Sequence, residues 1–253
     1  MSAHVELSVA GAVQTIRLNR AEKKNALTGE MYRVVAEALK AGDAAADIGV
    51  TVIFGQPGIF CAGNDVADFL AAGQGGAALH GFSLLQALVD REKPLIAAVD
   101  GPAVGIGTTL TLHCDLIFAS PRAVFQTPFV NLGLVPEAAS SLLGPRLMGH
   151  PLAFELLVMG EPFAADRAKE AGLVNHVVPA EALESTALKA AETLAQKPRE
   201  AVRISRRLLK GDPAPIKSRM EEEGAIFLER VKSNEAIAAF AAFLQKTPKG
   251  ARE

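Results

Sequence analysis

The alternation of apolar and polar residues at the start of the chain predicts a β-hairpin. Apolar side chains alternate with polar ones over residues 5–9, and a second apolar run covers residues 13–18, with Gly11 between the two. Beyond this hairpin, apolar positions recur at three- and four-residue spacing over residues 31–39, and Thr28 precedes them as an N-cap. We therefore expect two strands followed by an amphipathic helix.

The middle of the chain repeats a strand, a glycine-rich loop and a helix. The expected elements are a strand at 50–54, a loop at 55–63 and a helix from Asp65, then a strand at 95–99, a Gly/Pro turn at 100–105 and a helix at 106–113. A third unit has strands at 116–119 and 123–126, and a helix that starts at Val135-Pro136-Glu137 and runs to about Met148. The order is a β,β,α repetition without a repeated sequence.

Helical periodicity dominates from Pro151 onward, apart from one strand predicted at 173–178. Helices are expected at 182–196, 201–209, 214–231 and 235–245, separated by proline, glycine and capping residues. A boundary near Gln196 divides a core of residues 1–196 from a helical region of residues 197–253. The last helix carries an apolar stripe that we expect to bury against another subunit, which favours a homo-oligomer. The stripe comprises Ala236, Ile237, Phe240, Phe243 and Leu244.

Composition narrows the function classes. The 253 residues include 49% hydrophobic and 21% charged residues, as in soluble globular proteins, and a net charge of −2 argues against nucleic acid or an anionic membrane as partner. Cys61 and Cys114 form no CxxC pair, and the five histidines share no ligand spacing, so no metal site is expected. Glycines and charged residues interrupt the most apolar stretch, 94–120, and the chain shows neither a signal peptide nor a terminal Ser-Lys-Leu. We expect a cytoplasmic protein.

Two helix starts that follow glycine turns are the most informative chemical feature. Such ends present unpaired backbone N–H groups, one near Asn64 and one near Ile106. If the two ends converge, they form an oxyanion hole, in which one donor stabilises a transition state by roughly 3 kcal/mol. The ordinary alternative is a pair of tight turns that need glycine.

Other phosphate and nucleophile motifs are missing. Gly105-Ile106-Gly107 lacks the third glycine of a dinucleotide-binding loop, because Leu110 stands there, and no phosphate-binding Gly-Lys-Ser/Thr or Gly-x-Ser-x-Gly motif occurs. Glu137, a carboxylate within an apolar run, is the best acid/base candidate, since burial would raise its pKa toward neutrality. The alternative for Glu137 is an ordinary acidic residue in a first helical turn, and Asp65 has the same ambiguity.

Along nearly its whole length the sequence resembles the crotonase superfamily, also called the enoyl-CoA hydratase/isomerase family. The resemblance lies in Leu18-Asn19-Arg20 with residues 23–27, in Phe60-Cys61-Ala62-Gly63-Asn64-Asp65, and in residues 94–115 and 125–133. It implies an α/β spiral of ββα units with a helical C-terminal trimerisation region, trimers or dimers of trimers, and acyl-CoA thioester substrates. Coenzyme A would be part of the substrate, so no separate cofactor is expected.

The resemblance also assigns site residues. It implies that the backbone N–H groups of Asn64 and Ile106 form the oxyanion hole, with Glu137 as the catalytic proton shuttle. The residues implied to contact the substrate are Lys24, Ala26, Ala62, Gly63, Asp65, Gly105, Phe129, Leu132, Phe243 and Lys246.

Two departures from the family pattern indicate the reaction. The two glutamates of the family's hydratases correspond here to Thr109 and Phe129, neither of which can act as a carboxyl acid or base. Residues 101–106, Thr127-Pro128-Phe129 and Pro136-Glu137 instead resemble the peroxisomal-type Δ3,Δ2-enoyl-CoA isomerases. We therefore predict an isomerase that moves a double bond from the 3- to the 2-position of an enoyl-CoA. The alternatives are a hydratase or another reaction of this family, and an acyl-CoA-binding or scaffold protein without activity.

Overall fold

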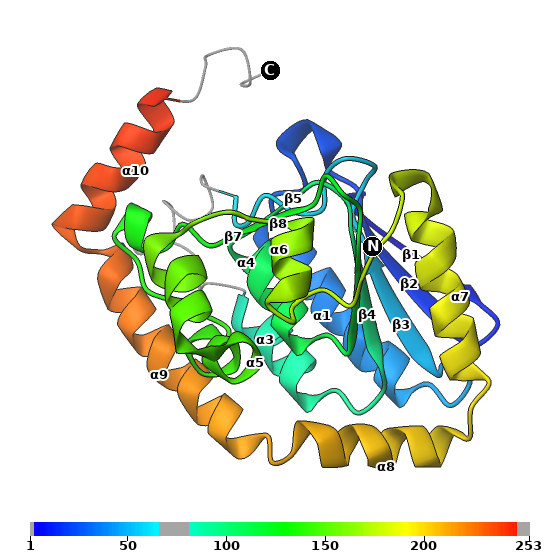
Figure 1. The fold of residues 1–253 in the computed structure, drawn as a ribbon. Coiled ribbons are helices and arrows are strands. Elements are labelled where there is room, and N and C mark those ends of the chain that lie inside the picture. The colour runs from blue at the N-terminus through cyan, green and yellow to red at the C-terminus, as the bar shows by residue number, and fades with distance from the viewer. Residues whose placement is uncertain (1–2, 66–80, 247–253) are drawn as a thin grey trace.

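The computed structural model describes residues 3–65 and 81–246, with the side chains up to residue 242, as a mixed α/β fold around one large sheet (Figure 1). The sheet order is β1-β2-β3-β4-β6-β9, with β1 antiparallel to β2 and the other neighbours parallel. Its strands are β1 (Val5–Ala10), β2 (Val13–Leu18), β3 (Val50–Phe54), β4 (Leu95–Val99), β6 (Leu116–Ala119) and β9 (His176–Val177). The predicted hairpin is confirmed, and Gly11 lies in its turn with φ of 56°.

A second, smaller sheet lies beside the first. Its order is β5-β7-β8, with β5 (Pro102–Val104) parallel to β7 (Val124–Gln126) and β7 antiparallel to β8 (Phe163–Ala164). The Gly/Pro turn predicted at 100–105 is therefore partly wrong, because β5 occupies its centre. Pro102 is tolerated there because the first residue of a strand at a sheet edge need not donate to a neighbour.

Helices cover both faces of the large sheet. On one face, α1 (Gly29–Ala44) and α3 (Gly81–Asp90) pack over the larger core, and the side chain of Thr28 accepts the N–H of Met31 at the start of α1 as predicted. On the other face, α7 (Leu183–Ala195) covers strands β2, β3, β4 and β6 and encloses a second apolar cluster. Both faces of β3 and β4 are thus buried, which explains their continuous apolar sequences.

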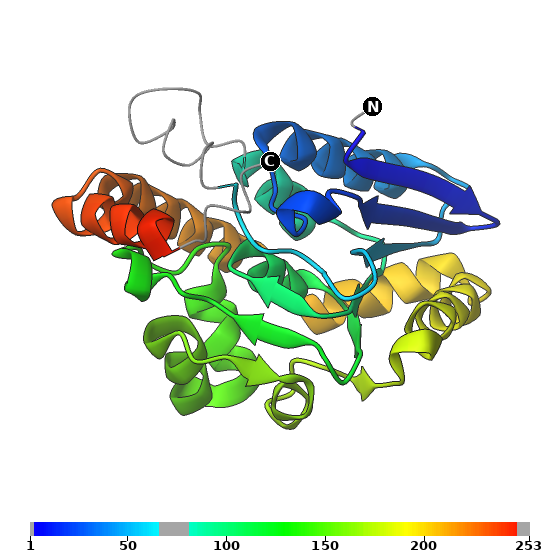
Figure 2. The same ribbon diagram turned by 90° about the horizontal axis from the view of Figure 1, so that it is seen from above.

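The remaining helices wrap around this core (Figure 2). They are α4 (Ile106–Thr109), α5 (Ser140–Phe154), α6 (Ala165–Glu170), α8 (Arg199–Lys210), α9 (Ala214–Val231) and α10 (Asn234–Lys246), with short helices η1 (Ala21–Lys23), η2 (Leu110–His113), η3 (Val130–Leu132), η4 (Glu155–Met159) and η5 (Ala180–Ala182). The predicted helical C-terminal region is present as α8, α9 and α10, whereas a division into two units at Gln196 stays a prediction. Within the described residues, no helix has both the length and the apolar character needed to cross a membrane.

The helix predicted to start at Val135-Pro136-Glu137 is a correction. Helix α5 begins at Ser140, and Glu137 lies in the irregular segment before it. Ala138 and Ala139 both adopt left-handed conformations, with φ of 61° and 55°, so no right-handed helix can pass through them. Gly149 kinks α5 further along. The helix predicted from Asp65 falls mainly on residues 66–80, outside the described residues.

Candidate functional site

The two predicted glycine loops lie side by side. Cys61 pairs with Ala103 in an isolated parallel bridge, and the N–H of Val104 donates to the Cys61 carbonyl at 2.8 Å. A Cβ placed on Gly63 would lie 3.1 Å from the Val104 carbonyl oxygen, so the two backbones approach closely. The structure therefore provides the convergence of loops that spacing alone left open.

The N–H groups of Asn64 and Ile106 occupy these adjoining loops. Neither donates a hydrogen bond to any residue in the part of the chain that the structure describes. Gly105, directly before Ile106, has φ of 55° and ψ of −120°, a conformation for which glycine is suited, and its own N–H donates to the Gln126 carbonyl at 2.8 Å. This turn leaves the first N–H of α4 free of backbone partners, as an anion-stabilising donor requires.

Several of the residues that the family resemblance implies as substrate contacts are also brought together. Ala62 donates its N–H to the Lys24 carbonyl at 2.9 Å, and Leu27 pairs with Asn64 in a parallel bridge. Arg20 ties this edge together, because its guanidinium contacts both the Ala26 carbonyl at 3.0 Å and the Asp65 carboxylate at 2.7 Å. Lys24, Ala26, Ala62, Gly63 and Asp65 thus border one region.

Glu137 is a half-buried carboxyl with an anchored oxygen. The Thr109 hydroxyl, on α4, donates to Glu137 Oε1 at 2.5 Å. Burial raises the pKa of Glu137 to about 7, helped by the negative charge of Glu223 and opposed by the Thr109 hydrogen bond. A carboxyl with this pKa exists in both protonation states near neutral pH, which suits it to accept and return a proton.

A hydrogen bond links α1 to the Asn64 loop. Tyr32 is buried on α1, and its hydroxyl donates to Asn64 Oδ1 at 2.6 Å. Burial and the nearby negative charge of Glu137 hold the pKa of the Tyr32 phenol well above its usual range, so Tyr32 stays a neutral donor. The hydrogen bond holds the Asn64 side chain in place.

The segment after Glu137 is held from two sides. Glu223 on α9 is buried, and its carboxylate accepts the N–H groups of Ala139 at 2.6 Å and Ser141 at 2.9 Å. His113 on η2 is also buried, and its Nε2–H donates to the Ala138 carbonyl at 2.8 Å. Burial lowers the pKa of His113 to about 4, so the imidazole stays neutral.

The remaining predicted contact residues have different outcomes. The ring of Phe129 borders the oxyanion loop, since its Cε1 lies 4.0 Å from a Cβ built on Gly105. Leu132, in η3, packs against the core. Phe243 and Lys246 belong to the last turns of α10, but their side chains lie outside the described residues.

Sequence reasoning missed the residues that support the site. Sequence patterns give Tyr32, Glu223 and His113 no role, and they mark Thr109 only as a position where the family's hydratases have a carboxylate. The sequence offers one feature that could draw attention to any of them, because Tyr32 is the single tyrosine of a chain without tryptophan. Each support depends on contacts between residues far apart in sequence.

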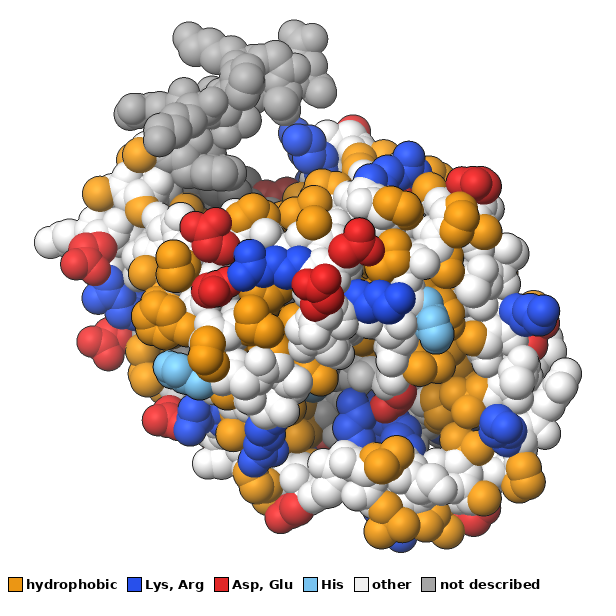
Figure 3. Space-filling model, in the orientation of Figure 1, with side chains coloured by type: hydrophobic (Ala, Val, Ile, Leu, Met, Phe, Trp, Pro, Cys, Tyr) orange, Lys and Arg blue, Asp and Glu red, His pale blue; other side chains and the backbone are white. Residues whose placement is uncertain are grey.

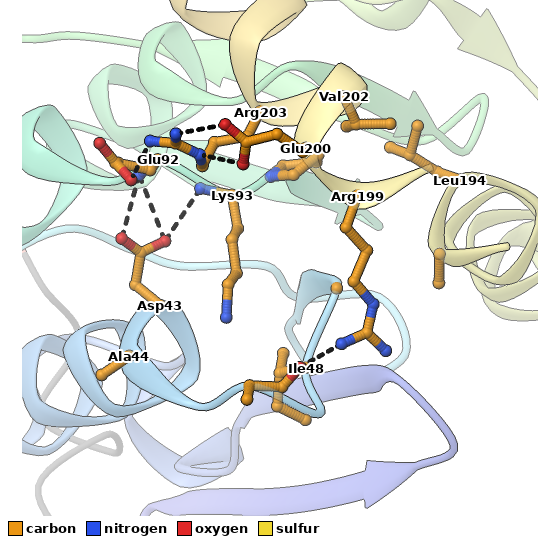
Figure 4. Close-up of a pocket in the computed structure, with 14 residues that line it drawn as sticks. Asp43, Ala44, Ile48, Glu92, Lys93, Leu194, Arg199, Glu200, Val202 and Arg203 are labelled. Carbon is orange, nitrogen blue, oxygen red and sulfur yellow. Dashed lines mark hydrogen bonds and ion pairs between the residues drawn. The ribbon is translucent and has the colours of Figure 1, made fainter. Parts of the chain in front are cut away.

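A pocket of about 290 Å³ opens elsewhere, between α8 and the segment that joins α1 to β3 (Figure 4). Its basic groups already have partners. Lys93 Nζ donates to the carbonyls of Gly42 and Ala45, Arg199 to those of Ala46 and Asp47, and Arg203 binds Glu92 and Glu200. The pocket is therefore a contact between α8 and the core and shares no residue with the site. Among the described residues no cluster of His, Cys, Asp or Glu could hold a metal ion.

Comparisons with known proteins agree with this fold. The family model described as "Enoyl-CoA hydratase/isomerase" matches residues 8–248. Enoyl-CoA delta isomerase 2 of Rattus norvegicus is 38% identical over 94% of this chain and 63% of its own length, so the chain spans about three fifths of that relative. A 4-chlorobenzoyl coenzyme A dehalogenase of Arthrobacter sp is 31% identical over 87% of this chain and 83% of its own.

Solved structures share the whole fold. The structure of Pseudomonas aeruginosa OdaA superposes with a TM-score of 0.91 and 41% identity, over 97% of this chain and 100% of that one. The fold is that of the crotonase-like proteins, with two adjoining glycine loops and a buried carboxyl. The chain belongs to the enoyl-CoA hydratase/isomerase family.

Proposed function

We propose that this protein is an enoyl-CoA isomerase that moves a double bond from the 3- to the 2-position of an acyl-CoA thioester. The observation that carries the proposal is the Glu137 carboxyl, which Thr109 holds by a hydrogen bond and which has a pKa of about 7. The resemblance of the chain to enoyl-CoA delta isomerase 2 supports it.

The geometry connects Glu137 to both oxyanion donors. Thr109, which anchors Glu137, lies on the same short helix as Ile106, whose N–H is one donor. The negative charge of Glu137 raises the pKa of the Tyr32 phenol. The Tyr32 hydroxyl in turn donates a hydrogen bond to the side chain of Asn64, whose backbone N–H is the other donor. One face of the site thus offers a base, and the adjoining loops offer two N–H groups.

The mechanism follows from these positions. Glu137 removes a proton from C2 of the 3-enoyl thioester, and the electron pair moves onto the thioester oxygen. The N–H groups of Asn64 and Ile106 stabilise this dienolate, and the protonated Glu137 then returns the proton to C4. Because Thr109 occupies Oε1, Oε2 is the oxygen that carries the proton between the two carbons. The product is the conjugated 2-enoyl thioester.

Hydration is the second candidate, because the family model covers hydratases as well. Adding water across a double bond requires one group to activate water and another to protonate carbon. Thr109 and Phe129 stand where the hydratases of the family have carboxylates, and both oxygens of Glu223 are occupied by backbone N–H groups. These contacts favour isomerisation.

We also propose that the protein assembles as a trimer or a dimer of trimers through its C-terminal helices. Supporting this, several apolar side chains on these helices are exposed in the single chain. They are Leu208, Leu209, Ile226, Leu228 and Ile237. The stripe predicted on α10 is partly covered within the chain, since Ala236 and Phe240 are buried.

The function is tested by incubating 3-enoyl-CoA with the wild type and with Glu137→Gln, followed by mass-resolved chromatography. We expect conversion to a 2-enoyl-CoA of equal mass, reduced by a factor of about 100 or more in the variant. Glu161→Gln, which removes an exposed carboxylate, is the matched control and should keep wild-type activity. A product heavier by one water with little isomerisation would identify a hydratase, and tight binding of acyl-CoA without turnover would identify a scaffold protein.

A further inference from the structure

Glu223 is a buried carboxylate that α9 inserts behind the candidate base. Only 5% of its surface is exposed, although it is separated from Ala139 by 84 residues in the sequence. Its Oε2 accepts the N–H of Ala139 and its Oε1 accepts the N–H of Ser141. Burial raises the pKa of Glu223 above its usual range, but the hydrogen bonds that it accepts from Ser141 and Ala139 and the charge of Arg219 favour the ionised form.

The two donors lie at the end of the left-handed turn and just after it. Ala138 and Ala139 are left-handed, which costs roughly 1–2 kcal/mol for each non-glycine residue, and they directly follow Glu137. Their conformation aligns the N–H groups of Ala139 and Ser141 toward one carboxylate. Without an acceptor at this point, two buried donors would lose their partner, and the segment could revert to the helix that its sequence predicts.

Several described elements bring charged and titratable groups to Glu137. Glu223 comes from α9 and Tyr32 from α1, and Thr109 on α4 adds a hydrogen bond. The neutral His113 on η2 contacts the next residue, Ala138, through its carbonyl. Arg219, one turn before Glu223 on α9, donates to the Ser141 hydroxyl at 3.1 Å and attracts Glu223. Among these neighbours, Glu223 is the group that brings a second negative charge.

We propose that Glu223 is a positioning residue, which holds the left-handed turn after Glu137 and keeps a second negative charge next to that carboxylate. This inference deepens the proposed isomerase function and rests on it for its catalytic consequence. The turn fixes the direction in which Glu137 leaves the backbone. The charge repels the ionised form of Glu137, so this carboxyl keeps the basicity that proton removal from carbon requires.

The single tyrosine allows a test that needs no turnover. In protein labelled with 13Cζ-tyrosine, NMR gives one tyrosine signal, and it belongs to Tyr32 next to Glu137. We expect this signal to shift in one step near pH 7, and Glu137→Gln should abolish the step. In Glu223→Gln the step should move down by about one pH unit, because removing a nearby like charge stabilises the carboxylate. The acid limb of the kcat/KM profile for 3-enoyl-CoA should move by the same amount.

The matched control is Glu221→Gln, which removes an exposed carboxylate from the same helix. In Glu221→Gln the titration step of the Tyr32 signal should stay at the wild-type pH. A step at the same pH in Glu223→Gln and Glu221→Gln, or no step in the wild type, would overturn the inference. The NMR titration tests the role of Glu223 even if 3-enoyl-CoA is not a substrate. Failure of the proposed isomerase function would show separately, as the absence of isomerised product.

A second variant covers the case in which Glu223→Gln does not fold, as judged by far-ultraviolet circular dichroism. Glu223→Asp keeps the negative charge but shortens the side chain, so the titration step should stay near pH 7. Because the turn is held less well, kcat should fall by roughly tenfold to a hundredfold while KM changes little. A kcat equal to that of the wild type would overturn the positioning role.

Discussion

The ionisation of Glu137 depends on a balance between neighbours that act in opposite directions. Burial and the charge of Glu223 disfavour the carboxylate, whereas the Thr109 hydroxyl stabilises it by donating a hydrogen bond. The resulting pKa of about 7 lies well above that of a free glutamate. Thr109 and Glu223 can each be substituted alone, so the contribution of each to the pKa of Glu137 can be measured.

Replacing Thr109 by valine should raise the pKa of Glu137 further. Valine has nearly the same shape but no donor, so the carboxylate loses its stabilising hydrogen bond. Since the base must be ionised to act, the acid limb of the kcat/KM profile should move to higher pH by about one unit. At pH 7 the rate should therefore fall, and it should largely recover at pH 9.

Thr109→Ser is the matched control, because it keeps the hydroxyl and should keep the wild-type pH profile. Thr109→Val and Glu223→Gln should shift the profile in opposite directions, which distinguishes them from general damage to the site. An unchanged profile in Thr109→Val would show that the hydrogen bond to Glu137 has no role in the reaction.

Among the elements, those with a clear apolar period were predictable from the sequence. Three elements have the bounds that the sequence predicts: the strands at 50–54 and 95–99 and the helix at 214–231. The strands are buried on both faces and the helix on one face, so their apolar residues form a clear pattern. Elements without such a period were not predictable. Strand β5 has three residues and depends on pairing with β7, and the start of α5 depends on Glu223, which no local pattern reveals.

One short element carries a strained residue at its end. Lys24 follows η1 with φ of 52° and ψ of 38°, and it is exposed, so its side chain gains little from burial there. Lys24→Gly should therefore raise the free energy of unfolding by roughly 0.5–1 kcal/mol, measured by urea denaturation. If Lys24 contacts coenzyme A as the family resemblance implies, the same change should raise KM for the acyl-CoA substrate.

The neighbouring Lys23 is the control for Lys24→Gly. Lys23 is equally exposed and lies within η1, where the left-handed region is not used. Lys23→Gly removes the same charge, but it should lower the free energy of unfolding by about 0.5 kcal/mol. A loss of stability in both variants would show that Lys24 is not strained.

At the scale of the whole molecule, the site is assembled from distant parts of the sequence. The sequence predicted the two glycine loops and Glu137 as parts of the candidate site, because glycine turns and an acidic residue in an apolar run are local signals. It could not identify Tyr32 or Glu223 as supports, since their partners lie 32 and more than 80 residues away. The loops and side chains that would meet a substrate are therefore easier to predict from sequence than the distant side chains that hold them in place.

The C-terminal helices also differ in how they attach to the core. Figure 3 shows a hollow above α8, in which basic and acidic side chains gather. Arg206 on α8 donates to Asp115 at 2.8 Å, and Lys210 donates to the His113 carbonyl at 2.9 Å. No residue of α8 is fully buried, so these polar contacts contribute much of what holds the helix. Its two most exposed apolar side chains, Leu208 and Leu209, remain available to another surface.

This attachment leads to a prediction about assembly. Leu208 and Leu209 are 74% and 89% exposed. Exposing these apolar side chains to water is unfavourable, and burial against a neighbouring subunit would remove that cost. Sedimentation equilibrium should give a mass of three or six chains for the wild type, and a lower mass for Leu208→Lys combined with Leu209→Lys.

Leu7→Lys, at an exposed apolar position on β1, is the control and should keep the wild-type mass. A monomeric wild type would contradict the proposed assembly itself, whereas a double variant with the wild-type mass would place the interface away from α8. The variant should also keep its far-ultraviolet circular dichroism spectrum, because the contacts of Arg206 and Lys210 that hold α8 are unchanged. Loss of assembly without loss of helix would thus separate what α8 does within the chain from what it does between chains.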